Sequence, residues 1–158
     1  MHGYSRIAGL GALALTAACN PFHRSVQVSK DINYNQRWHG TLTSPGFLAG
    51  AVQITGSASM APGTDGSKTT VMVTVSNATP GGMHPWEVHK GQCGMDQGIF
   101  GSLENYKAVK IGSNGQGDAS TVLEIATPTY GNYFVLLHAS PTNRETVVGC
   151  GNLAPPAP

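Results

Sequence analysis

The densest group of chemically capable side chains lies in residues 82–93, which read GMHPWEVHKGQC. Alternate residues of a β-strand share a face. A strand through this stretch therefore places Glu87 and His89 on one face and Trp86 and Val88 on the other. A carboxylate and an imidazole are both ligands that proteins use for divalent metals. The stretch predicts a metal-binding face backed by an apolar core face.

The composition limits both the class of fold and the class of partner. The chain has 158 residues, of which 11% are charged, with 21 Gly, 10 Pro and a net charge of +1. This length is sufficient for one domain with a hydrophobic core. Few charges and many Gly and Pro favour a turn-rich β-protein. A net charge so close to zero gives no electrostatic argument for a nucleic-acid partner.

A β pattern begins near residue 38. The clearest strand is 69–76, where Val71, Val73 and Val75 alternate with more polar residues. A turn cluster at 62–67 joins it to a weaker strand at 51–60. No amphipathic helix is evident, and the pattern indicates an all-β antiparallel sandwich or barrel. Further strands are predicted at 83–90, 106–111, 119–125, 133–138 and 146–150.

The N-terminus has the pattern of a processing signal. Arg6 precedes a short apolar run, which is far below the roughly 20 residues that a spanning helix needs. Residues 15–19, LTAAC, resemble the lipobox of bacterial lipoproteins, with Thr16 where Leu is more usual. The resemblance implies a signal peptide at 1–18, lipidation of Cys19 and a tether at 19–37. An ordinary secretory signal is the alternative.

The lipobox resemblance also implies a location. Asn20 is not the aspartate associated with inner-membrane retention, so the resemblance favours the periplasmic face of the outer membrane. The lipid anchor would then be the chain's contact with the membrane. With Cys19 lipidated, Cys93 and Cys150 remain as a pair, which should form a disulfide in an oxidising compartment. The Pro-rich residues 154–158 are predicted to be disordered or polyproline-like, beyond a folded domain at 38–153.

Three ordered segments resemble copper/zinc superoxide dismutases. Residues 82–89 are similar to the family motif G-[LM]-H-G-F-H-V-H, and Cys93 follows where that family has a disulfide cysteine. Residues 133–139, YFVLLHA, resemble the strand that ends in a late copper histidine. Residues 148–153, VGCGNL, resemble the segment with the second disulfide cysteine. The resemblance covers roughly residues 40–153 and implies a Greek-key β-barrel with a Cys93–Cys150 disulfide.

The departures from that family concern its metal site. The resemblance assigns copper to His89 and His138, with Glu87 at a third position where the family has histidine. No histidine lies between Cys93 and His138, so the bridging histidine and the other zinc histidines are absent and no zinc site is expected. The position of the catalytic arginine holds Val147. Arg144 and Glu145 are out of register and are predicted to decorate a loop.

Each candidate also has a structural interpretation. His84 matches a non-ligating histidine of the family and is predicted to be a hydrogen-bonded structural residue. His89 and His138 could instead be surface histidines that remain from an ancestral site. Glu87 would in that case be a solvated surface residue, as most glutamates are.

Three functions follow from these alternatives. The first is a cell-envelope lipoprotein whose superoxide-dismutase-like barrel binds copper at most weakly and does not dismutate, because a carboxylate in place of an imidazole disfavours Cu(I). The second is an active copper-only dismutase that converts superoxide to hydrogen peroxide and oxygen. The third is an interaction domain without metal. The sequence does not identify a protein partner or an oligomeric state.

Overall fold

The computed structural model describes residues 37–48, 50–51 and 53–156. In this part of the chain the regular elements are β-strands and two short 3-10 turns, so the prediction of an all-β antiparallel fold is confirmed. None of the described helices is long and apolar enough to span a membrane. The predicted signal peptide, the lipidation site at Cys19 and the tether up to residue 36 lie outside the described residues.

The elements are β1 (Trp38–Thr43), η2 (Gly46–Leu48), β2 (Thr55–Pro62), β3 (Thr69–Ser76), β4 (Met83–His84), β5 (Trp86–Gln92), β6 (Met95–Ile99), η3 (Leu103–Asn105), β7 (Val109–Lys110), β8 (Gly117–Leu123), β9 (Tyr133–Ser140) and β10 (Asn143–Leu153).

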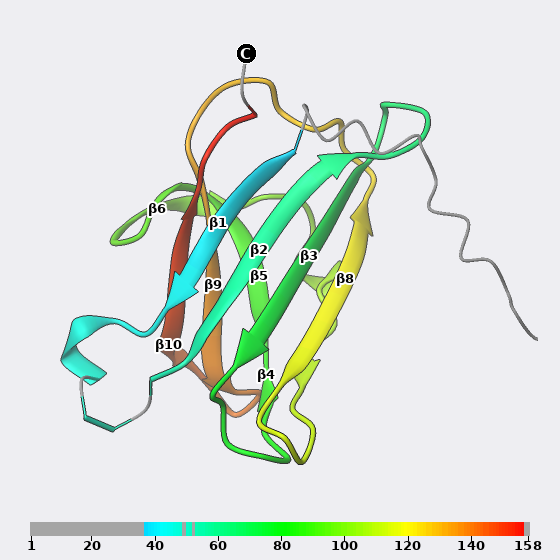
Figure 1. Cartoon of the computed structure of the whole chain (residues 1–158). Helices are drawn as coiled ribbons and strands as arrows, with labels where there is room; N and C mark the ends of the chain where they lie inside the picture. Colours follow the sequence, from blue (N-terminus) through cyan, green and yellow to red (C-terminus); the bar gives the residue numbers. More distant parts are fainter. Residues whose placement is uncertain (1–36, 49, 52, 157–158) are drawn as a thin grey trace, which may run out of the picture.

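Eight strands form one antiparallel sheet in the order β6-β5-β9-β10-β1-β2-β3-β8, and β4 pairs separately with β7. The sheet curls into a half-barrel, so that β1, β2, β3 and β8 cross in front of β5 and β9 in Figure 1. Strands far apart in the sequence are neighbours: β10 lies beside β1, β9 beside β5 and β8 beside β3. This topology brings segments from residues 86 to 150 together on one outer face.

The hydrophobic core fills the concave side of the curled sheet. Val71, Val73 and Val75 of β3 are at most 1% exposed, which confirms the alternation predicted for 69–76. Trp86 and Val88 of β5 are fully buried, as predicted. Because these two residues face inward, the residues between and beside them on β5 point to the opposite, outer face.

The predicted strand at 83–90 is divided in two. Pro85 separates β4 from β5, because proline has no N–H to donate to a ladder and is not tolerated in the middle of a sheet. The predicted strand at 106–111 is reduced to β7, which pairs with β4 instead of the large sheet. The short strand β6 was not predicted, since residues 95–98 are exposed and lack apolar alternation.

Two backbone features concern the C-terminal end of the domain and the spacing between β2 and β3. Ala154 still pairs with His39 by two backbone hydrogen bonds of 2.7 and 3.2 Å, so pairing continues one residue beyond the predicted boundary at 153. A Cβ atom at Gly56 would overlap the carbonyl oxygen of Thr74 on β3. Glycine is therefore required at position 56 for β2 and β3 to lie in this register.

Candidate functional site

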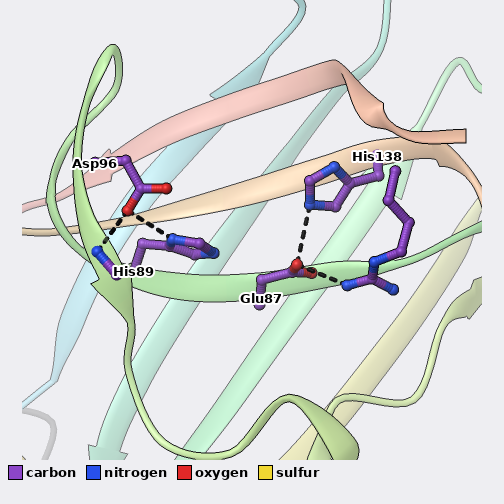
Figure 2. Close-up of polar contacts among 6 residues, drawn as sticks. Glu87, His89, Asp96 and His138 are labelled. Atoms are coloured by element: carbon purple, nitrogen blue, oxygen red, sulfur yellow. Dashed lines mark hydrogen bonds and ion pairs between the residues drawn. The ribbon is translucent and has the colours of Figure 1, made fainter.

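The outer face of β5 and β9 holds a buried carboxylate–imidazole contact. Glu87 of β5 pairs in register with Leu136 of β9, and His138 lies two residues further along β9 on the same face. The His138 Nε2 atom donates a hydrogen bond to Glu87 Oε1 at 3.0 Å (Figure 2). Glu87 is 5% exposed and His138 7%. The structure therefore brings together two of the three predicted ligands, and neither is a surface residue.

Arg144 of β10 reaches the same carboxylate. Its Nη2 atom donates to Glu87 Oε1 at 2.7 Å. The prediction that Arg144 and Glu145 decorate a loop is wrong, because both lie in β10. The register of β10 against β9 is irregular between Asn143 and Val147, and this irregular segment carries the arginine. Nothing in the sequence indicates where such an irregularity falls.

The charge of Glu87 is compensated locally. Burial alone would raise the pKa of Glu87, but the hydrogen bond from His138 and the nearby charge of Arg144 outweigh it and lower the pKa below its usual value. Glu87 is therefore ionised at neutral pH. Its second oxygen, Oε2, is buried and has no hydrogen-bond partner among the described residues.

The third predicted ligand, His89, is oriented by Asp96. The His89 Nδ1 atom donates to Asp96 Oδ1 at 2.8 Å, and the same oxygen accepts a hydrogen bond from the Gly98 backbone N–H at 2.7 Å. Burial raises the pKa of Asp96, but these two hydrogen bonds lower it by more. An ionised carboxylate can only accept, so Nδ1 of His89 carries a proton, and in the neutral form of the ring the lone pair is on Nε2.

That free lone pair is where a metal would bind. His89 Nε2 is buried and unpaired within the described residues, and the His89 side chain is 13% exposed. In Figure 2 the ring extends from Asp96 towards the side of the strand that carries Glu87. A histidine whose other ring nitrogen donates to a carboxylate is the usual arrangement at metal sites. Sequence reasoning missed Asp96, which lies in an exposed hairpin and belongs to no motif.

His84 of β4 contacts the backbone of His138. Its Nδ1 atom lies 2.9 Å from the backbone carbonyl oxygen of His138 and donates to it, and His84 is 8% exposed. The His138 backbone N–H donates in turn to the carbonyl of Pro85 at 2.8 Å. The prediction that His84 is hydrogen-bonded is confirmed, and its structural role stays a prediction.

The donor types suit a divalent ion, but the contacts leave it little room. Glu87 and His138 already bond to each other, and Arg144 occupies the same carboxylate oxygen. Across residues 37–48, 50–51 and 53–156, no group of three or more His, Cys, Asp or Glu is arranged to hold a metal ion. The metal role of Glu87, His89 and His138 thus stays a prediction that rests on the unpaired buried atoms.

The disulfide holds this face together. Cys93 and Cys150 are bonded, with their Cα atoms 6.1 Å apart. The bond links the turn after β5 to β10, across β9. The Cys93 backbone N–H also donates to Asn152 Oδ1 at 2.8 Å. Because the same hairpin carries Asp96, the disulfide restrains the residue that orients His89.

A groove of about 670 Å³ adjoins the cluster on the same outer face. It runs between the disulfide and η2, where Phe47 is 76% exposed. Leu136 and Val147, the cross-strand neighbours of Glu87 and His138, line its near end. All of its lining residues are uncharged, and it includes none of the three predicted ligands. The groove and the polar cluster are therefore separate features of one surface.

The fold and the site define a disulfide-linked all-β protein with a buried Glu–His–Arg cluster on the outer face of its sheet. The sequence matches no protein-family model and no curated protein.

Proposed function

We propose that this chain is a cell-envelope lipoprotein with a superoxide-dismutase-like barrel that acts as a non-dismutating binding module. Its outer face captures a divalent cation such as Cu(II) weakly, through Glu87, His89 and His138. One observation carries the proposal: the buried, unpaired Nε2 atom of His89, oriented by Asp96, lies on the same face as the Glu87–His138 contact. A bound Cu(II) would supply a Lewis acid and a one-electron acceptor at this face.

The same contacts account for weak binding without turnover. Glu87 is a hard ligand, which favours Cu(II) over Cu(I) and so opposes the redox cycling that dismutation requires. Arg144 already compensates the charge of Glu87. A cation must compete with this arginine and with the hydrogen bond from His138.

Copper binding is the direct test. We expect the purified protein to approach one Cu(II) per chain only when free Cu(II) is in excess, with a dissociation constant of about 10 micromolar or weaker. We also expect its electron paramagnetic resonance spectrum to show nitrogen hyperfine lines. His89→Ala should lower the affinity at least tenfold and remove part of that hyperfine structure, because an aromatic nitrogen ligand is lost. Equilibrium dialysis gives the stoichiometry and the spectrum gives the ligand type.

The matched control is His39→Ala, which removes an exposed imidazole on β1. This variant should bind copper as the wild type does. Equal losses in His39→Ala and His89→Ala would indicate adventitious binding to histidines in general. No retained copper in the wild type would leave the metal-free interaction domain as the better function.

An active copper-only dismutase is the second candidate, and the position of Arg144 favours it. A positive side chain beside the metal ligands would attract the superoxide anion. A superoxide assay of the copper-loaded protein distinguishes the two functions. Activity above that of the same concentration of free copper, lost in His89→Ala, would support the dismutase and contradict a non-dismutating module.

The envelope location is supported by the disulfide between Cys93 and Cys150, since such bonds persist in oxidising compartments. We expect Cys19→Ser to release the protein from the membrane fraction of a bacterial host that processes lipoproteins, because the acyl chains would have no attachment point. Cell fractionation and labelling with a radioactive fatty acid measure this. An unchanged membrane fraction in Cys19→Ser would favour the ordinary secretory signal combined with another mode of attachment.

A further inference from the structure

We propose that Arg144 is a built-in counter-cation of the cluster, which competes with a divalent ion for Glu87 and thereby sets the low affinity of the site. This inference rests on the proposed function. It goes further by assigning a regulatory role to a residue for which the sequence predicted none.

The hydrogen-bond geometry defines the competition. His138 Nε2 and Arg144 Nη2 both donate to Glu87 Oε1, at 3.0 and 2.7 Å. The shorter of the two contacts is the one from the guanidinium. A charge-assisted hydrogen bond of this length is among the strong ones. A cation that uses Glu87 as a ligand therefore has to weaken the contact with Arg144.

The exposure of the partners decides which of them moves. Glu87 is 6% exposed at its side chain and His138 9%, whereas the side chain of Arg144 is 39% exposed. A guanidinium that already touches solvent can turn into water at a lower cost than a buried side chain can. The carboxylate of Glu87 is buried, and its own movement would break the buried hydrogen bond with His138. Displacement of Arg144 is therefore the route by which Glu87 becomes available.

The charge of the cluster gives the direction of the effect. With Arg144 in place the Glu87–Arg144 pair is neutral, so an approaching cation meets little net attraction. Without the guanidinium, Glu87 is a buried carboxylate with one unpaired oxygen and only His138 as its partner. Such a carboxylate attracts a cation strongly, because solvent screens it poorly. Removal of the positive charge should therefore tighten metal binding, the opposite of what loss of a ligand does.

The test compares Arg144→Met with Arg144→Lys and Lys90→Gln in competition titrations with Cu(II) alone. Arg144→Met keeps an apolar stem without the charge, and we expect about tenfold tighter binding. Arg144→Lys keeps the charge and should remain within about threefold of the wild type. Lys90→Gln removes an exposed charge from β5 that makes no ion pair with Glu87, and should change the affinity less than twofold. Arg144→Gln repeats the charge removal if the Met variant does not fold.

A second readout is the melting temperature, with and without copper. With a chelator present, Arg144→Met should melt below the wild type, because the buried carboxylate has lost its counter-charge; added Cu(II) should raise its melting temperature more than that of the wild type. Folded Arg144→Met and Arg144→Gln that bind Cu(II) no tighter than the wild type would overturn the inference and leave the proposed function standing. Copper bound by Arg144→Met but not by the wild type would overturn the proposed function and support the inference. Copper bound by neither would overturn both.

Discussion

Replacement of Cys93 and Cys150 together by serine is expected to lower the free energy of unfolding by about 4 kcal/mol. The bond closes a loop with a sequence separation of 57 residues, and opening it returns that loop entropy to the unfolded chain. Urea denaturation of the oxidised wild type and of the double variant measures the difference. A loss of this size is a large fraction of the stability of an ordinary domain.

Reduced wild-type protein is the control for the substitutions themselves. It lacks the cross-link but keeps both native side chains, so it should lose about as much stability as the double serine variant. A stable reduced wild type beside an unstable variant would show that serine at these half-buried positions, and not the missing bond, is responsible.

The disulfide should also affect the candidate site. Cys93 begins the hairpin that carries Asp96, and Asp96 orients His89. Loosening of this hairpin should let the His89 ring rotate, and Cu(II) affinity should fall several-fold in the part of the double variant that remains folded. An unchanged affinity would show that Asp96 is held by β5 and β6 alone.

Glu87→Ala is expected to destabilise the metal-free protein by about 3 kcal/mol. The substitution leaves His138 buried without its acceptor and Arg144 without its counter-charge. Breaking a buried pair by removing one partner costs about 3–5 kcal/mol, and the lower end applies because Arg144 can turn into solvent. Glu124→Ala is the matched control. Its carboxylate is 73% exposed and pairs with Lys68 at 2.9 Å, so its loss should cost less than about 1 kcal/mol.

The stability that ionised Glu87 confers should depend on pH. The folded-state pKa of Glu87 lies below its usual 4.5, so folding favours the ionised form. The contribution is complete above pH 4.5 and is lost as the pH falls through the folded-state pKa. Wild-type protein with a chelator should therefore lose stability on acidification below pH 4.5 more steeply than Glu87→Gln. Parallel pH profiles for the two proteins would show that the ionised state of Glu87 contributes nothing to folding.

Much of the fold could be predicted from local pattern. The alternating Val71, Val73 and Val75 determine which face of β3 is buried, and the turn at 62–67 determines its hairpin partner. The cysteine count predicted the disulfide. The break at Pro85 follows from proline chemistry and could have been predicted from the same residues. These features depend on side-chain period and on backbone chemistry, which are properties of the sequence alone.

The candidate site was predictable only in part. Alternation along 82–93 by itself placed Glu87 and His89 on the face opposite Trp86 and Val88. The partners of these two residues come from elsewhere: Arg144 lies 57 residues from Glu87 in the sequence, and Asp96 lies across a hairpin from His89.

Only the tertiary structure determined which residues contact the side chains of the segment 82–93. The pairing of β5 with β9 and β6, and the irregular register of β10, bring Asp96, His138 and Arg144 to the outer face of β5. The sequence predicted that Glu87 is either a metal ligand or a solvated residue. In the structure Glu87 is buried and its charge is compensated by Arg144. The physical reason is that strand register depends on the sum of long-range packing, whereas the period of side chains along one strand is local.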